Sequence, residues 1–239
     1  MVVENLVEVR NRIADVCGQC GRKQQDILLV AVSKTFGWEV LREAVNGGQQ
    51  DFGENYVQEL TEKRRALNDP GIRWHYIGHL QSNKAKSIVD YVHLIHSVDN
   101  QHLAQELDRR AEKANRTVDI LMEVRTTDEA TKFGVLPTKV VELAKAISKL
   151  KNVRIQGLMT MGPFSDDPND SRPSFRQLVD LKHTLDNEGI ENVSMRHLSM
   201  GMTHDFQVAI EEGATIVRIG TAIFGKRTSL LKEPMKGAL

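Results

Sequence analysis

The sequence predicts a single (β/α)8 barrel with an additional N-terminal helix. Short apolar segments rich in β-branched residues alternate with segments of helical spacing along the whole chain, a pattern typical of a parallel sheet. Eight apolar segments occur in 239 residues, which is the usual size of such a barrel. No change of composition divides the chain, so we expect one domain over 1–239. The predicted strands are 26–34, 49–53, 73–78, 92–98, 118–125, 153–160, 193–199 and 216–220.

Helical spacing fills the stretches between these strands. An amphipathic helix is expected over 1–20, before the first strand, and further helices over 101–114, 138–150 and 174–187. A long polar loop, 163–173, follows the sixth strand, and 226–239 is expected to form a closing helix or a weakly ordered tail. An open doubly wound sheet is the structural alternative. It would bind a nucleotide through a glycine-rich first turn, and this sequence has none.

Composition excludes several classes of partner. The chain is 40% hydrophobic and 27% charged, with 32 basic and 32 acidic residues, so no net charge attracts nucleic acid or a membrane surface. The first residues, MVVENLVEVRNR, lack an apolar signal core, and no apolar run reaches the length of a membrane span. We therefore expect a cytoplasmic protein with no nucleic-acid or membrane partner.

Two cysteines, Cys17 and Cys20, form the segment CGQC. Such a pair is either a redox couple or half of a zinc site. Here it follows the N-terminal helix instead of a strand, and no second cysteine pair exists to complete a metal site. None of the eight histidines belongs to an H-E-x-x-H motif. We expect no function for the cysteine pair and no metal site.

Lys34 ends the first predicted strand. Alternate side chains of a strand share a face, so Lys34 lies on the same face as Leu28, Val30 and Val32. The simplest interpretation is a lysine that reaches into solvent at the strand end. In a barrel, however, the carboxyl ends of the strands carry the chemistry, and a desolvated lysine has the free amine that a Schiff base requires.

The ends of the seventh and eighth strands predict a phosphate site. They read HLSMGMTHDF, 197–206, and VRIGTAIFG, 217–225, and barrels often bind phosphate at these two loops. Gly201 and Gly220 allow close backbone approach to a ligand. Hydroxyl groups come from Ser199, Thr203 and Thr221. Ordinary turn and cap chemistry is the alternative for either loop taken alone.

Arg218 is expected to face the barrel mouth. Alternation in IVRIG places Ile216, Arg218 and Gly220 on one face. A guanidinium in that position needs an anion or a hydrogen-bond acceptor, and an internal Asp or Glu is the alternative to a ligand. The second and third strand ends add further polar side chains. These are Glu54, Asn55, His75, Gln81, Asn83 and Lys84, where the asparagines are alternatively helix starts and His75 a core histidine.

Six segments in order resemble one family, the pyridoxal phosphate homeostasis proteins, also called the YggS or PROSC group. They are VAVSKT (30–35), FGENYVQE (52–59), WHYIGHLQSNK (74–84), GLMTM (157–161), HLSMGMTHDF (197–206) and VRIGTAIFG (217–225). The resemblance implies a barrel like the N-terminal domain of alanine racemases. It also implies pyridoxal 5′-phosphate (PLP) as the cofactor, bound as a Schiff base to the lysine of VAVSKT, which is Lys34.

The same resemblance implies roles for other residues. Ser199, Gly220 and Thr221 hold the phosphate, Met200 belongs to the same cofactor-binding set, Arg218 faces the pyridine nitrogen, and Asn55 lies near the ring. The sequence departs from the family at three positions. Arg125 replaces an asparagine at the end of the fifth strand, Asp128 replaces a common glycine, and Thr203 replaces a serine.

Family function is regulatory, so the resemblance implies a PLP carrier that supplies apo PLP-dependent enzymes and balances vitamin B6 pools. No residue is expected to be catalytic, because the racemases use a second domain that supplies a tyrosine and this chain is expected to lack that domain. One alternative is a small PLP-dependent amino-acid racemase. Another is a barrel that binds a sugar phosphate and uses Lys34 as an aldolase-type amine.

Overall fold

Eight parallel strands form a closed barrel in the computed structural model, which describes residues 1–127 and 133–226, and the strands follow one another around the barrel in chain order. The predicted fold class is therefore confirmed. The strands are β1 (Leu28–Val32), β2 (Asp51–Glu54), β3 (Arg73–Tyr76), β4 (Leu94–Val98), β5 (Val118–Glu123), β6 (Val153–Met159), β7 (Val193–Ser199) and β8 (Ile216–Ile219).

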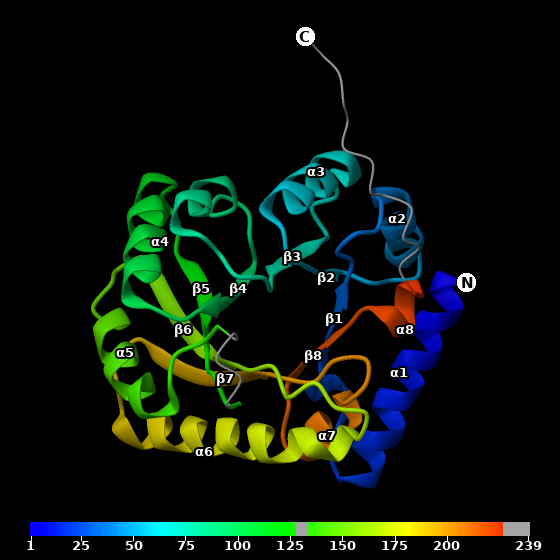
Figure 1. Cartoon of the computed structure of the whole chain (residues 1–239). Coiled ribbons are helices and arrows are strands. Elements are labelled where there is room, and N and C mark those ends of the chain that lie inside the picture. The colour runs from blue at the N-terminus through cyan, green and yellow to red at the C-terminus, as the bar shows by residue number, and fades with distance from the viewer. Residues whose placement is uncertain (128–132, 227–239) are drawn as a thin grey trace.

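Helices surround the strands (Figure 1). They are α1 (Val2–Gln19), α2 (Trp38–Asn46), α3 (Val57–Leu67), α4 (Gln101–Lys113), α5 (Val140–Ile147), α6 (Arg172–Glu188), α7 (Phe206–Glu211) and α8 (Thr221–Phe224), with short 3-10 helices η1 (Gln24–Asp26), η2 (Ser82–Ser87), η3 (Pro137–Lys139) and η4 (Pro168–Ser171). The expected closing helix or tail at 226–239 lies outside the described residues, except for Lys226.

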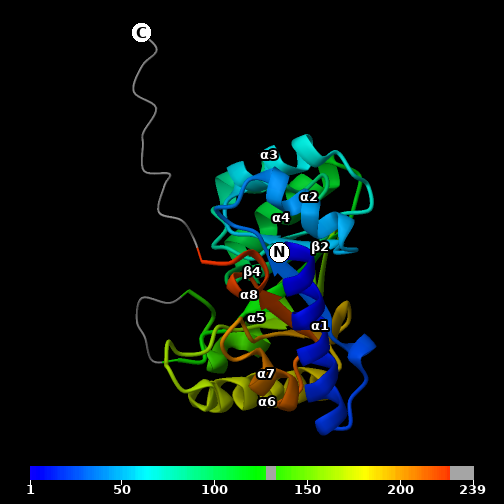
Figure 2. The same cartoon turned by 90° about the vertical axis from the view of Figure 1, so that its right-hand side faces the viewer.

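The additional helix α1 covers one side of the barrel. It packs against α2, α7 and α8, and in Figure 2 it faces the viewer with α2 and α3 above it and α6 and α7 to the left of its lower half. Its buried face repeats at helical spacing, with Leu6, Val9 and Ile13 among the buried residues. Asn5 also donates a hydrogen bond to the carbonyl of Ile223 at 2.8 Å, which links α1 to α8.

Alternation along the strands separates two apolar regions. Val30, Leu94 and Ile216 belong to a small cluster inside the barrel, whereas Leu29 and Ala31 belong to the large core between strands and helices. Each strand therefore sends every second side chain inward, as the pleat requires. The inward-facing side chains at the carboxyl ends of the strands therefore lie at the barrel mouth.

Strand β1 is shorter than the predicted segment 26–34. It ends at Val32 because residues 33–36 form a turn, in which the N–H of Phe36 donates to the carbonyl of Ser33 at 3.1 Å and the backbone of Thr35 is left-handed, with φ of 72°. Ser33 and Lys34 consequently lie in the turn that leaves the barrel. At the other end of the segment, Asp26 belongs to η1.

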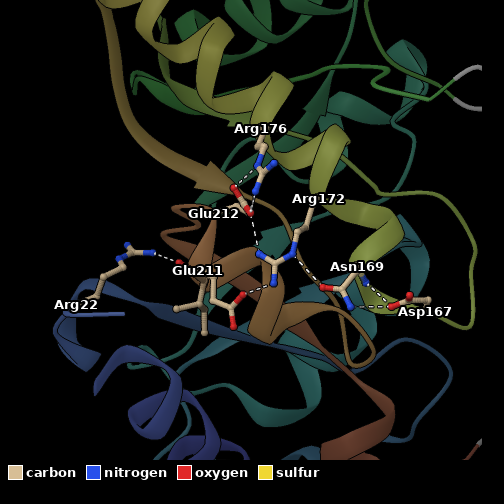
Figure 3. A network of polar contacts seen from close by, with 8 residues as sticks. Arg22, Asp167, Asn169, Arg172, Arg176, Glu211 and Glu212 are labelled. Atoms are coloured by element: carbon tan, nitrogen blue, oxygen red, sulfur yellow. Dashed lines mark hydrogen bonds and ion pairs between the residues drawn. The ribbon is translucent and has the colours of Figure 1, made fainter. Parts of the chain in front are cut away.

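A polar network joins α6 to α7 on the outside of the barrel (Figure 3). Arg172 at the start of α6 contacts Glu211 and Glu212 at 2.5 and 2.8 Å, and Arg176 contacts Glu212 at 2.9 Å. Hydrogen bonds from Arg176 and Arg172 lower the pKa of Glu212 below its usual value, with burial opposing. Arg22 completes the group by donating to backbone carbonyls of α7 and the following turn. The network fixes the two helices that follow β6 and β7.

Among residues 1–127 and 133–226, no helix combines the length and the apolar character needed to cross a membrane.

Candidate functional site

A cavity of about 420 Å³ opens at the carboxyl ends of the strands. Its lining comes from the segments after β1, β2, β3, β6, β7 and β8, which is where barrels place ligand sites. Lys34, Asn55, Arg218, Gly220 and Thr221 all line it. These five sequence-predicted residues come from positions up to 187 residues apart, and the fold brings them to one cavity.

The two neighbours of Lys34 are fixed against α3. The Ser33 hydroxyl donates to Oε1 of Glu54 at 2.6 Å, and the backbone N–H of Thr35 donates to Oε2 of Glu59 at 2.8 Å. A left-handed β-branched residue costs about 1–3 kcal/mol, so tertiary contacts must hold Thr35 in place. The residues on both sides of Lys34 are thus anchored while Lys34 itself lines the cavity.

Lys63 is the centre of that anchor. Its ammonium donates to the Ser33 carbonyl at 2.8 Å, to Glu54 at 2.6 Å and to Glu59 at 2.9 Å. The side chain is buried, as is Glu54. Burial raises the pKa of Glu54 to about 7, while the charge and hydrogen bonds of Lys63 oppose the rise. A buried lysine with three acceptors fixes the end of β1 relative to α3.

Arg218 lies at the floor of the cavity with neutral partners. Its guanidinium donates to the hydroxyl of Ser199 at 2.6 Å and to the carbonyl of Thr160 at 2.9 Å. Within the described part of the chain it forms no ion pair, so the internal Asp or Glu expected as an alternative is not what holds it. Burial lowers its pKa to about 10, and Asp205 and Glu123 oppose this from longer range. The guanidinium remains charged at neutral pH and can donate to an acceptor in the cavity.

Ser199 and Met200, two residues of the expected cofactor-binding set, are not among the residues that line the cavity. Both are fully buried, and the Ser199 hydroxyl lies 2.6 Å from Arg218 and 2.9 Å from Nδ1 of His96. Ser199 is the last residue of β7, and its side chain faces the barrel interior beneath the cavity. The residues of this loop that do line the cavity are 202–205.

The loop after β7 is shaped by Gly201 and Asp205. Gly201 has φ of 89°, and a Cβ there would lie 2.5 Å from that of Ala209, so only glycine fits. Asp205 accepts from the backbone of Met202 at 2.7 Å and from the Ser171 hydroxyl at 2.8 Å. The turn brings Thr203 into the cavity lining, where its hydroxyl lies 3.4 Å from that of Thr221.

Asn55 supplies a polar atom that the described protein does not satisfy. Its side-chain oxygen Oδ1 is buried and has no hydrogen-bond partner. The backbone is held firmly, because the Tyr76 hydroxyl donates to the Asn55 carbonyl at 3.0 Å and a Cβ on Gly78 would lie 2.3 Å from that carbonyl. Since α3 begins at Val57, Asn55 is not its N-cap. A buried unpaired acceptor at a cavity is a feature that a ligand donor would satisfy.

The remaining predicted polar residues lie apart from the cavity. His75 is inside the barrel, where its ring is hydrogen-bonded to Asp51 and His96. The sequence analysis did not predict a role for Asp51 or His96. Lys84 lies on η2 and lines a separate surface groove with Arg64. Gln81 is the N-cap of η2, and Asn83 lies inside that helix. Arg125 follows β5, and its backbone N–H donates to the carbonyl of Val135. Asp128 is outside the described residues.

The cysteine pair lies at the end of α1. Cys17 is buried and Cys20 is exposed, and both are free thiols. Burial, with help from the neighbouring Cys20, raises the pKa of Cys17 above its usual value, which disfavours a reactive thiolate. In residues 1–127 and 133–226, no group of three or more His, Cys, Asp or Glu side chains is arranged to hold a metal ion.

Comparison with known proteins places this chain in a family. Residues 5–228 match the family model described as "Alanine racemase, N-terminal domain". A relative from Aquifex aeolicus, named "Pyridoxal phosphate homeostasis protein", is 48% identical over 224 residues, covering 94% of this chain and 97% of the relative. A relative of the same name from Schizosaccharomyces pombe is 41% identical, covering 85% of each chain.

Solved structures agree with the fold. PipY of Synechococcus elongatus, in the structure described as having PLP bound, is 34% identical with a TM-score of 0.83, covering 94% of this chain and all of its own. An alanine racemase of Clostridium difficile shares the fold at 15% identity, with a TM-score of 0.76 over 95% of this chain and 57% of the racemase. The chain belongs to the alanine racemase N-terminal domain family and, within it, to the pyridoxal phosphate homeostasis proteins.

Proposed function

We propose that this protein binds pyridoxal 5′-phosphate through Lys34 and acts in PLP homeostasis as a carrier, without substantial catalytic turnover. The observation that carries the proposal is the joint presence of Lys34, Arg218 and the Thr203–Thr221 hydroxyl pair in the lining of one cavity. Its volume of about 420 Å³ suits a small cofactor. The names of the relatives and the PLP in PipY support the same ligand.

The residues of the cavity fit the groups of PLP. The amine of Lys34 condenses with the aldehyde, forming a C=N bond and releasing one water. Hydroxyls of Thr203 and Thr221 donate to the phosphate, whose negative charge makes these hydrogen bonds stronger than neutral ones. Arg218 donates to the ring nitrogen, and Asn55 offers its unpaired oxygen to a donor on the ligand. When bound, PLP supplies an electron sink for carbanion chemistry.

Low turnover follows from what this chain places around Lys34. Racemisation needs a proton donor or acceptor on each face of the α-carbon, and Lys34 serves one face. None of the three tyrosines, all within the described residues, lines the cavity. The Tyr76 hydroxyl donates to the carbonyls of Asn55 and His79, and burial raises its pKa to about 12. Tyr91 bonds to Thr61 in the separate groove.

The positive charge of Arg218 beside the ring nitrogen also weakens PLP as an electron sink. Arg218 is charged and donates hydrogen bonds, so it disfavours a proton on the nitrogen it faces. The weakened sink does not by itself prevent racemisation, so the cavity lining without a tyrosine is the argument that favours a carrier over the racemase alternative. We extend the proposal to apo PLP-dependent enzymes as recipients and to a cytoplasmic location, on the grounds of the family resemblance and the balanced charge of the chain.

Trapping the linkage tests the proposal. The protein mixed with PLP should absorb as a Schiff base, and borohydride reduction followed by peptide mapping should place the pyridoxyl group on Lys34. Lys34→Ala should remove the absorbance and keep the circular dichroism of the fold. Lys84→Ala, a change in the separate groove, serves as the matched control and should behave like the parent. Label found mainly on another lysine, or no absorbance at all, contradicts the assignment.

A further inference from the structure

A continuous chain of hydrogen bonds crosses the inside of the barrel from the cavity floor to its opposite end. Ser199 Oγ lies 2.9 Å from Nδ1 of His96, and Nε2 of His96 lies 3.0 Å from Nδ1 of His75. Nε2 of His75 lies 3.0 Å from Oδ1 of Asp51. His75, His96 and Ser199 are completely buried. This hydrogen-bond chain begins at Arg218, so it connects the cavity lining to Asp51, the first residue of β2.

The chemistry of its two ends fixes the direction of every bond. Arg218 has only donors, so Ser199 Oγ must accept from it and send its single hydrogen to His96. His96 Nδ1 is therefore an acceptor, and its Nε2–H donates to His75. His75 Nδ1 then accepts, and its Nε2–H donates to the Asp51 carboxylate. All hydrogens are accounted for only when both imidazoles are neutral and carry their proton on Nε2.

Asp51 anchors the far end as a carboxylate. Arg73 donates to both of its oxygens, at 2.7 and 2.5 Å. Burial raises the pKa of Asp51, but hydrogen bonds from His75 and Arg73 outweigh it and the net direction is down. An ionised Asp51 can only accept, so His75 cannot turn its bare nitrogen toward it. The sense of the whole chain follows from this one acceptor.

We propose that His96 and His75 are positioning residues that hold Arg218 in place at the cavity floor through this one-way hydrogen-bond chain. Their contribution to ligand binding rests on the proposed function, whereas their tautomers do not. With Ser199 locked as an acceptor by His96, and the carbonyl of Thr160 as the second acceptor, the guanidinium has a fixed plane. Arg218 therefore presents its remaining donors to the cavity in one orientation, without a carboxylate that would neutralise it.

The surroundings of His96 disfavour its protonated form. The charged and titratable groups that act on it are His75, His93, His197 and Arg218, and Asp51 and Arg73 lie at the far end of the hydrogen-bond chain. Burial, together with His75 and Arg218, lowers the pKa of His96 well below its usual value. A proton added to Nδ1 of His96 would displace the hydrogen bond that the Ser199 hydroxyl donates to this nitrogen. The chain is therefore expected to keep its direction across neutral pH.

Histidine NMR on the protein without added ligand tests the chain itself. Long-range ¹H–¹⁵N spectra should show His75 and His96 as Nε2–H tautomers, and His96 should stay neutral at neutral pH because burial lowers its pKa. Assignment by His75→Gln and His96→Asn identifies the two signals. An Nδ1–H tautomer at either residue, or a protonated His96 at neutral pH, overturns the proposal. This result is independent of whether PLP binds.

Ligand affinity tests the effect on Arg218. His96→Leu removes the acceptor for the Ser199 hydroxyl, and we expect PLP and pyridoxal affinity to fall together by about ten-fold or more, since Arg218 faces the ring and not the phosphate. His96→Asn returns an acceptor near Nδ1 and should recover most of the loss. His93→Leu is the control, because His93 lies edge-on to His75 outside the chain and is exposed. Equal loss in His96→Leu and His96→Asn, or none in either, overturns the positioning role.

Folding is monitored in the same variants. If His96→Leu does not fold, Ser199→Ala breaks the chain with a smaller change and should lower both affinities in the same way. Loss of PLP affinity without loss of pyridoxal affinity in Ser199→Ala contradicts the proposal, because it would place Ser199 at the phosphate. If the parent protein binds no PLP, the proposed function is wrong. The NMR result on the two tautomers still decides whether the hydrogen-bond chain from Ser199 to Asp51 exists.

Discussion

The hydroxyl oxygens of Thr203 and Thr221 lie 3.4 Å apart at the cavity, although 17 residues separate them in the chain. Thr203 follows β7 and Thr221 begins α8 after β8, so the pair bridges the two loops at which barrels commonly bind phosphate. Two hydroxyls on neighbouring loops form a donor pair for one anionic group. Thr203 lines the cavity, whereas Ser199 lies below it, so we propose Thr203 together with Thr221 as the hydroxyl donors to the phosphate.

The phosphate prediction follows from that pair. Thr203→Val and Thr221→Val each remove one hydroxyl donor at nearly constant volume. A hydrogen bond to a charged group contributes about 1.5–3 kcal/mol, so each change should weaken PLP binding about ten-fold or more. Pyridoxal, which lacks the phosphate, should lose little. Fluorescence titration with both ligands measures the ratio, and equal losses for PLP and pyridoxal would locate the phosphate elsewhere.

Lys63 is predicted to hold the turn that carries Lys34. Lys63→Met removes the ammonium that bonds the Ser33 carbonyl, Glu54 and Glu59, and leaves two carboxylates without their shared partner. Breaking a buried ion pair costs about 3–5 kcal/mol, and urea unfolding should show a loss of that order. Lys86→Met on η2 is the control, because Lys86 is exposed and should lose less than about 0.5 kcal/mol. A neutral result for Lys63→Met would show that the cluster does not stabilise the fold.

Glu123 is predicted to make stability depend on pH. Burial, and secondarily the charge of Asp99, raises its pKa from 4.5 to about 7, and Arg218 opposes the rise. A carboxyl group with a raised folded-state pKa contributes stability that is complete below its unfolded pKa and is lost as the pH rises through the folded value. At 1.36 kcal/mol per pKa unit, the loss is about 3 kcal/mol.

Glu123→Gln isolates this contribution, because glutamine does not titrate. The stability of the parent minus that of Glu123→Gln should fall between about pH 4.5 and about pH 8, as measured by urea unfolding at a series of pH values. Glu62→Gln, on the exposed surface of α3, is the control for the Glu-to-Gln substitution itself. A parent-minus-variant difference for Glu123→Gln that stays constant or grows with pH contradicts the assignment.

Amino-acid turnover is predicted to be absent at useful rates. The PLP-loaded protein should not racemise or transaminate the common L-amino acids at rates near about 10 s⁻¹, the typical enzyme value, because none of the three tyrosines, all within the described residues, lines the cavity to act opposite Lys34 as a tyrosine does in the racemases. Chiral chromatography of the incubated amino acids measures this. Turnover near that rate, abolished by Lys34→Ala and retained by Lys84→Ala, would favour the racemase alternative instead.

The sequence by itself determined the barrel and predicted that five polar or glycine residues meet at its mouth. Strand periodicity is a property of near neighbours, so the inward face shared by Val30 and Val32 could be derived from the local sequence, although Lys34 itself lies in the turn after the strand. Eight such segments separated by helical spacing left few architectures for the chain. Because parallel strands present their carboxyl ends together, Lys34, Asn55, Arg218, Gly220 and Thr221 were expected at one mouth, and all five line the cavity.

Only the tertiary structure decided which polar groups meet. His96 and Ser199 are 103 residues apart, and nothing in either local sequence shows that their strands place them 2.9 Å from each other inside the barrel. Ser199 and Thr203 are both hydroxyl residues of one loop, and the left-handed turn at Gly201, fixed by packing against Ala209, is what sends Thr203 to the cavity while Ser199 stays below it. Periodicity fixes the direction of a side chain, but a hydrogen bond depends on distances between strands, and these are set by the closure of the barrel and the packing of its helices.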